Sequence, residues 1–203
     1  MRTKTLLIAA VLGAMVIATA SAQVASVNVV GYVNKPLNEG LSLITNPLSN
    51  GGNMASEIIP EAPGGTTIYL YDGGTFTSSV FLGGWNPDVA LPVGVGFYIQ
   101  VSEDTTITFI GEVQQNEASN KAIPAGLSIQ GSIVPQEGTL GEKLEFPASV
   151  GDTAYKFDGT GFEIFTYFGV WTPEDPVLAV GDALFIDKMD AGDWNRDFAV
   201  TVN

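Results

Sequence analysis

The chain repeats itself: residues of its first half recur 86 positions later, in the same order and without a gap. The recurrence runs from Asn34 to Pro87 and is carried mainly by glycine, aromatic residues and aspartate before glycine. A sequence that encodes one unit twice is expected to fold as two similar units that stack on each other. The matched positions include Asn34 and Asn120, Gly40 and Gly126, Gly65 and Gly151, Tyr69 and Tyr155, Asp72 and Asp158, Phe76 and Phe162, Trp85 and Trp171, and Pro87 and Pro173.

Beyond Pro87 the spacing grows by one residue, so that Ile99 matches Ile186. This pattern divides the chain into a leader at 1–22, a first β repeat at 23–113 and a second β repeat at 114–203. The segment 108–113 (TFIGEV) resembles 28–33 (NVVGYV), the segment that opens the first repeat. We therefore expect the strand at 105–113 to be shared between the two repeats.

Both repeats read as all-β. Short apolar or alternating runs are separated by glycine, proline, asparagine and aspartate, which is the pattern of strands and turns. The sequence predicts two tandem β-sandwich-like repeats packed together, with Asn53–Ile59 and Gly141–Glu145 as the only candidates for a helical turn. The expected strands are Val27–Val33, Leu41–Thr45, Thr67–Tyr71, Thr75–Phe81, Gly96–Val101 and Thr105–Val113, then Gly126–Val134, Thr153–Phe157, Gly161–Phe168, Ala183–Asp187 and Asp197–Val202.

The first 22 residues have the three parts of a secretory signal peptide. A basic start at Met1–Lys4 is followed by an apolar run at Leu6–Ala18 and by small residues at Ala20–Ala22. The apolar run is shorter than the roughly 20 residues that a membrane-spanning helix needs, which argues against the alternative of a retained anchor. We expect cleavage after Ala22 and a location that is secreted, periplasmic or on the outer surface of a Gram-negative-type bacterium.

Composition excludes several kinds of chemistry. The chain has no cysteine and no histidine, so thiolate or imidazole catalysis and the metal sites built on those side chains are ruled out. It has 22 acidic and 8 basic residues and a formal net charge of −14. Such a chain repels phosphate, so nucleic acid and anionic lipid are poor partners.

The three tryptophans are the candidate ligand-binding residues. Trp85 and Trp171 match between the repeats, and a pair of exposed indoles is a platform on which sugar rings stack. The alternative is that each repeat needs a tryptophan in its core. Trp194 has no match in the first repeat, and it is the better candidate for an exposed ring.

Aspartates gather near the C-terminus. Asp187, Asp190 and Asp193 could supply oxygen ligands to calcium, the one cofactor that the sequence suggests. Their spacing differs from that of known calcium loops, and Lys188 intervenes. A solvated turn between two strands is the competing interpretation.

No pair of carboxylates is marked out for catalysis. Glycoside hydrolysis needs two carboxyl groups and no histidine. However, no glutamate is kept at matching positions of the two repeats, and the matched Asp72 and Asp158 both precede glycine in expected turns. We predict that the protein is not an enzyme.

The motifs of the repeat resemble those of uncharacterised exported β-repeat proteins of verrucomicrobial-type bacteria. The segment NVVGYVN at Asn28–Asn34 resembles the start of those proteins, and their repeated unit combines G-x-N-L-I-x-N-P-L, Y-x-[FWY]-[DN]-G, Y-F-G-G-W and L-x-P-G-E-G-F-F-I. The resemblance implies export and a β-rich fold, and it brings no activity with it. The corresponding segments are Gly40–Leu48, Tyr69–Gly73, Phe81–Trp85 and Leu91–Ile99 in the first repeat, and Gly126–Val134, Tyr155–Gly159, Tyr167–Trp171 and Leu178–Ile186 in the second.

These observations favour a noncatalytic exported protein that serves as a structural or adhesive component of the cell envelope or extracellular matrix. A carbohydrate-binding accessory module is the alternative. The expected partners are further copies of the chain, paired through edge strands such as Val27–Val33, or cell-surface glycans.

Overall fold

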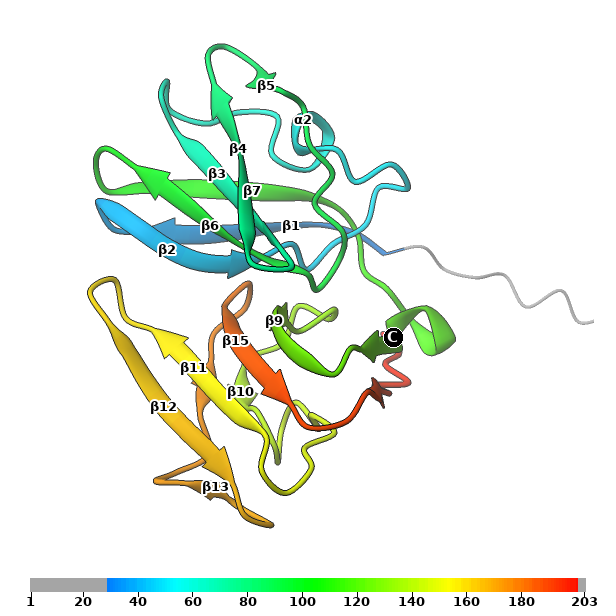
Figure 1. The fold of residues 1–203 in the computed structure, drawn as a ribbon. Helices are drawn as coiled ribbons and strands as arrows, with labels where there is room; N and C mark the ends of the chain where they lie inside the picture. The colour runs from blue at the N-terminus through cyan, green and yellow to red at the C-terminus, as the bar shows by residue number, and fades with distance from the viewer. Residues whose placement is uncertain (1–28, 201–203) are drawn as a thin grey trace, which may run out of the picture.

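The computed structural model describes residues 29–200, so the predicted signal peptide at 1–22 lies outside the described residues. The fold is all-β, as predicted, and contains two five-stranded antiparallel sheets. Figure 1 shows one sheet above the other, with the first repeat in blue to green and the second running from green through yellow to red. The two repeats pack against each other as adjacent lobes.

The first repeat has the sheet order β2-β6-β3-β4-β5 and a separate two-stranded ribbon, β1-β7. The ribbon and the short helix cover one face of the sheet. The elements are β1 (Val30–Leu37), β2 (Gly40–Thr45), α2 (Ala55–Ile58), β3 (Thr67–Asp72), β4 (Thr75–Phe81), β5 (Trp85–Asn86), β6 (Gly96–Val101) and β7 (Thr105–Glu112).

The second repeat has the same strand order, β9-β15-β11-β12-β13, and its ribbon is the shorter pair β8-β16. A small pair, β10-β14, stands where the first repeat has its helix and loop. The elements are η1 (Asn116–Ser119), β8 (Lys121–Ile123), β9 (Gly126–Gly131), β10 (Gly138–Thr139), β11 (Thr153–Phe157), β12 (Phe162–Tyr167), β13 (Trp171–Thr172), β14 (Val177–Leu178), β15 (Ala183–Lys188) and β16 (Gly192–Trp194).

Each repeat has its own apolar core between its sheet and its ribbon. Side chains alternate along the strands, so that one face of each sheet is buried inside its own repeat. In β6, for example, Phe97, Ile99 and Val101 face the core of the first repeat, whereas Tyr98 and Gln100 lie on the opposite face. That opposite face is the one that meets the other repeat.

The expectation of a shared strand is wrong. β7 pairs with β1 along its whole length, and its end bridges to Ser49, so its backbone partners belong to the first repeat. The second repeat has its own counterpart, because Trp194 of β16 lies opposite Lys121 just as Ile107 of β7 lies opposite Lys35. The two similar segments of the first repeat are the two strands of one ribbon, which bury the same alternating pattern against the same core.

The strand expected at Asp197–Val202 is also wrong for the residues that are described. The last strand is β16, and the chain after Trp194 is irregular. Asp197 has a positive φ of 41°, which interrupts an extended strand. The backbone N–H groups of Arg196 and Asp197 both donate to the side-chain oxygen of Asn120 instead of to a strand.

The two repeats are joined by contacts that come in exchanged pairs. The N–H of Thr45 donates to the carbonyl oxygen of Gly181 at 2.9 Å, and the N–H of Gly131 donates to that of Gly94 at 2.9 Å. Thr45 and Gly131 are matched positions, as are Gly94 and Gly181. Exchanging the two repeats therefore converts each of these hydrogen bonds into the other. This is the geometry of a twofold-symmetric dimer interface.

Glycine is required where the two sheets come closest. A Cβ added at Gly96 would lie 2.2 Å from Cγ2 of Ile129, and one added at Gly131 would lie 2.4 Å from Cγ2 of Thr45. Both distances are far below van der Waals contact. The absence of a side chain at these two positions lets the faces of the sheets approach each other.

Candidate functional site

The three tryptophans are buried, so the predicted sugar platform on their rings is wrong. The exposed fractions are 6% for Trp85, 5% for Trp171 and 1% for Trp194. Trp85 donates its indole N–H to the carbonyl oxygen of Ile59 at 2.8 Å, and Trp194 donates to that of Leu144 at 2.6 Å. Trp171 is equally buried, but its indole nitrogen has no hydrogen-bond partner among the described residues.

Trp194 has a structural counterpart in the first repeat, although the sequence repeat does not match the two residues. Its register places it where the first repeat has Ile107, a core residue of β7. Sequence identity between β7 and the segment from β16 onward has been lost, so the two positions do not align by residue type. The ring of Trp194 packs edge-on against Phe146 at a centroid distance of 5.1 Å. It lies in the core of the second repeat, beneath the shorter ribbon.

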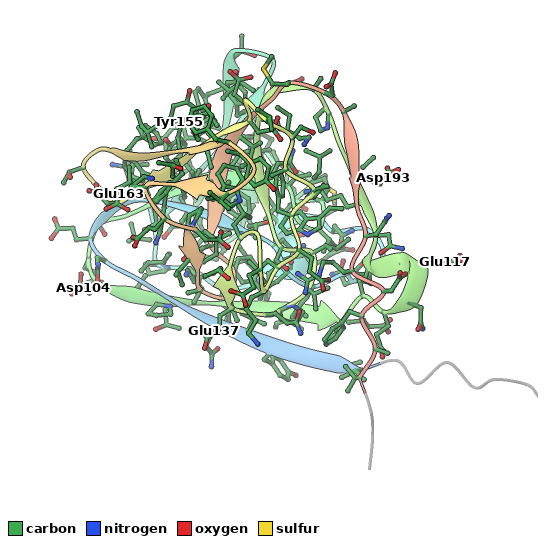
Figure 2. The ribbon with its side chains drawn as sticks, turned by 90° about the horizontal axis from the view of Figure 1, so that it is seen from below. Asp104, Glu117, Glu137, Tyr155, Glu163 and Asp193 are labelled. Carbon is green, nitrogen blue, oxygen red and sulfur yellow. The ribbon has the colours of Figure 1, made fainter. Side chains whose placement is uncertain are left out.

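The predicted calcium ligands do not form a cluster. Asp187 lies on β15, Asp190 in the following turn and Asp193 on β16, and all three are exposed. Within residues 29–200, no group of three or more acidic, histidine or cysteine side chains is close enough to hold a metal ion. Figure 2 shows Asp193 at the periphery, among other acidic residues that are spread around the outside.

Six aromatic side chains gather between the two sheets instead. We call them the aromatic hexad; the first repeat contributes three from β3, β4 and β6, and the second contributes three from the counterparts β11, β12 and β15. Tyr98 and Phe185 lie at its centre with ring centroids 6.0 Å apart, and Leu43 and Ile129 pack beside them. The members of the hexad are Tyr71, Phe76 and Tyr98 of the first repeat and Phe157, Phe162 and Phe185 of the second.

The contacts within the hexad also come in exchanged pairs. Tyr71 meets Phe185 edge-on at 5.6 Å, and their counterparts Phe157 and Tyr98 meet edge-on at 5.4 Å. The contact between Tyr71 and Phe76 at 5.3 Å matches that between Phe157 and Phe162 at 5.2 Å. Aromatic pairs in these geometries add to the attraction from area burial, so the hexad is a specific joint between the repeats.

Two hollows adjoin the hexad, and they are counterparts of each other because their lining residues occupy matched positions of the two sheets. Hollow 1 has a volume of about 540 Å³ and hollow 2 of about 310 Å³. They share Phe162 and Phe185, so they adjoin. Hollow 1 is lined by Leu41, Tyr69, Phe76, Tyr98, Gln100, Phe162 and Phe185, and hollow 2 by Leu127, Tyr155, Phe162, Phe185 and Asp187.

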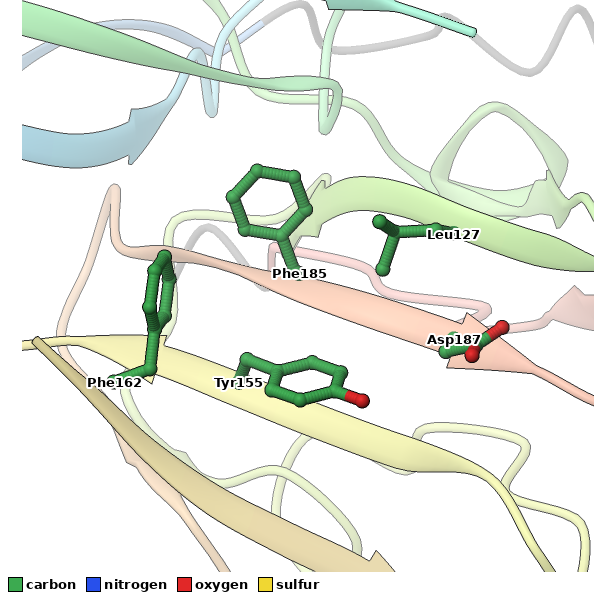
Figure 3. A pocket seen from close by; sticks show the side chains of 5 residues that line it. All are labelled: Leu127, Tyr155, Phe162, Phe185 and Asp187. Atoms are coloured by element: carbon green, nitrogen blue, oxygen red, sulfur yellow. The ribbon is translucent and has the colours of Figure 1, made fainter. Parts of the chain in front are cut away.

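Figure 3 shows the five side chains of hollow 2 on one face of the second sheet, with Phe162 and Phe185 rising from their strands and the ring of Tyr155 between them and Asp187. Alternation along β11 and β15 places them there, because Ala154, Leu184 and Ile186 point into the core on the other side. The lining is therefore set by ordinary strand geometry.

The hollows combine accessible rings with a few polar groups. Phe76 is 50% exposed and Phe162 is 46% exposed, so solvent reaches both rings. In hollow 1 the hydroxyl of Tyr69 donates to the side-chain oxygen of Gln100 at 2.9 Å. Burial raises the pKa of Tyr98 above its ordinary value, so this phenol stays neutral and polar at physiological pH.

This set of groups is suited to binding. It offers flat apolar rings, three phenols, an amide and one carboxylate. Of the residues that line the hollows, only Asp187 was predicted as a site residue, because the tryptophans carried the more familiar sugar-binding pattern. The available signal was the match of Tyr69 with Tyr155 and of Phe76 with Phe162, because these positions fall on the same face of adjacent strands.

No family model, no curated protein and no solved structure matches the chain. Among the described residues, no helix has the length and apolar character needed to cross a membrane.

Proposed function

We propose that the protein is a noncatalytic exported adhesive protein of the cell envelope or extracellular matrix, and that it binds cell-surface glycans in the two hollows between its repeats. The observation that carries this proposal is the pair of adjoining hollows lined by solvent-accessible aromatic rings. Exposed apolar surface of this kind on a folded chain marks an interaction site.

Glycans are the ligand class that the lining fits best. A sugar ring has an apolar C–H face that packs on an aromatic ring, and hydroxyls at its edge that bond to amides, phenols and carboxylates. Hollow 1 supplies the rings of Phe76 and Tyr69 and the amide of Gln100. Hollow 2 supplies Phe162, Tyr155 and Asp187 in the corresponding arrangement.

A structural role through self-assembly is the second candidate. It is supported by β1, the eight-residue strand of a two-stranded ribbon, which exposes Val30 and Tyr32. A strand of this length at the margin of a sheet can pair with the backbone of another chain. Sedimentation of the purified chain over a range of concentrations tests this role, which predicts growing assemblies that Tyr32→Lys suppresses.

The test of glycan binding is a glycan array, followed by titration with the best-bound oligosaccharide. Phe162→Ala is the decisive variant, because its ring reaches both hollows and is largely exposed. We expect affinity to fall by about tenfold, the loss typical of a central aromatic contact.

Phe168→Ala is the matched control. Phe168 is also an exposed phenylalanine of the second repeat, but it lies after β12 and lines neither hollow. It should bind as the unchanged chain does. Binding that is lost equally in both variants, or an array with no bound glycan, would contradict the proposal.

A further inference from the structure

The two hollows differ in charge at one matched position. Gln100 of hollow 1 lies opposite Leu41, and Asp187 of hollow 2 lies opposite Leu127, so the two side chains occupy the same place in their sheets. Hollow 1 has a neutral amide there, and it is already bonded to Tyr69. Hollow 2 has a carboxylate.

The carboxylate of Asp187 is not neutralised by a basic side chain. None of the ion pairs formed within residues 29–200 includes it. The next residue, Lys188, points the other way into the core and pairs with Asp152 at 2.7 Å. Asp187 is exposed at the rim of hollow 2, so its charge is open to a ligand.

The rest of hollow 2 also favours a cation. Three aromatic rings, those of Tyr155, Phe162 and Phe185, line it together with the carboxylate, and no basic residue does. The faces of aromatic rings attract organic cations, and a nearby carboxylate adds to this attraction. The net charge of −14 draws cations toward the chain as a whole.

We infer that hollow 2 selects glycans built of glucosamine units, whose free amino group binds as an ammonium ion at Asp187 while the sugar ring packs on Phe162 and Tyr155. This inference rests on the proposed glycan binding and adds the class of sugar to it. Hollow 1, with Gln100 in place of the carboxylate, accepts neutral units of the same chain.

The experiment is calorimetric titration of the full chain at pH 6 with β-1,4-linked hexamers of glucosamine, N-acetylglucosamine and glucose. The glucosamine hexamer should bind about tenfold more tightly than the other two, as one charge-assisted hydrogen bond allows. Asp187→Asn should abolish this preference, so that the variant binds the three hexamers with equal affinity.

Two further variants separate a local effect from the overall charge. Asp190→Asn makes the same change in net charge at an exposed position outside the hollows and should keep the preference. Gln100→Asp places a carboxylate in hollow 1 and should strengthen the preference.

Each failure has a distinct meaning. If no hexamer binds the unchanged chain, the inference about glucosamine is wrong, and the proposed function is wrong as well when the glycan array also shows no binding. If the three hexamers bind equally, glycan binding stands and the selectivity is wrong. If the preference survives Asp187→Asn, or disappears equally in Asp190→Asn, the role of Asp187 is overturned.

Discussion

Trp85 and Trp171 hold the same place in their repeats, yet only the first has a partner for its indole N–H. Trp85→Phe removes a hydrogen bond and leaves the carbonyl oxygen of Ile59 without that donor. Trp171→Phe removes a buried donor that has no acceptor in the described chain. The loss of ring volume is the same in both, so it cancels in the comparison.

We therefore predict that Trp85→Phe lowers the free energy of unfolding by about 1 kcal/mol more than Trp171→Phe does. Urea unfolding followed by tryptophan fluorescence and circular dichroism measures both. An equal loss, or a larger loss for Trp171→Phe, would show that the indole bond to Ile59 contributes nothing.

Lys121 is the residue whose titration the fold changes most clearly. It is the counterpart of Lys35, which forms an ion pair with Asp182 across the repeat junction. Within the part of the chain that the structure describes, the ammonium of Lys121 bonds only to the carbonyl oxygen of Gly94, and burial lowers its pKa from 10.5 to about 7. The unfolded chain therefore binds this proton more tightly than the folded chain does.

The sign of the pH dependence follows from that difference. Below about pH 7 Lys121 is protonated in both the folded and the unfolded chain, so the folded chain bears the full free-energy cost of burying the ammonium. Between about pH 7 and 10.5 Lys121 is neutral in the folded chain but still protonated in the unfolded chain. The free energy of unfolding therefore increases with pH, by up to about 1.4 kcal/mol per pH unit. Unfolding measured between pH 7 and 9.5, below the range in which Tyr98 titrates, should show this slope, and Lys121→Met should remove it.

The matched repeat suggests a second variant. Val95 occupies the position that corresponds to Asp182, so Val95→Asp supplies Lys121 with the carboxylate that Lys35 already has. The slope should disappear in this variant as well. A slope that persists unchanged in both Lys121→Met and Val95→Asp would mean that Lys121 does not cause it.

At the scale of the elements, the sequence predicted the long strands well, because alternation and turn residues mark them directly. β4, β6 and β11 begin and end where the pattern placed them, and the helical turn lies within Asn53–Ile59 as expected. The two-residue strands and the three-residue strands β8 and β16 were missed. They are too short to show a period of two, and tertiary pairing alone defines them.

The second repeat uses a buried ion pair where the first uses uncharged side chains. Lys188 of β15 and Asp152, just before β11, are both fully buried and are 2.7 Å apart, and Asp152 also accepts the N–H of Met189. The matched positions in the first repeat are Thr66 and Val101.

Asp152→Thr should therefore lower the free energy of unfolding by about 3–5 kcal/mol, because it leaves the ammonium of Lys188 buried without a counter-ion. Adding Lys188→Val, which recreates the combination of the first repeat, should recover at least half of that loss. Chemical denaturation of the single and double variants checks this. A double variant no more stable than the single one would contradict it.

At the scale of the whole molecule, internal duplication predicted two similar packed units but not how they meet. The residues at the joint, such as Leu43, Tyr98 and Phe185, look like ordinary strand residues in the sequence, because both faces of their sheets are apolar. The sequence therefore does not distinguish the residues of the joint from those of the two cores. The structure has a core in each repeat and a third apolar cluster between them.

The candidate site was missed because the sequence does not show how the two repeats meet. Hollow 1 lies at the margin of the third cluster, and it exists only because two matched sheets face each other across an approximate twofold axis. Neither repeat forms either the hexad or hollow 1 from its own residues alone. A pattern read along one strand cannot reveal which surface of another sheet it will meet.

The central claim is that the repeats pack face to face through exchanged aromatic contacts, and two double-mutant cycles test it most directly. The cycles are Tyr71→Ala with Phe185→Ala, and Tyr98→Ala with Phe157→Ala; the control cycle pairs Tyr71→Ala with Phe146→Ala, which lies in the core of the second repeat. We predict coupling energies of about 0.5–1.5 kcal/mol, equal within error, in the first two cycles and none in the control. Additive effects in both cross-repeat cycles would contradict the claim.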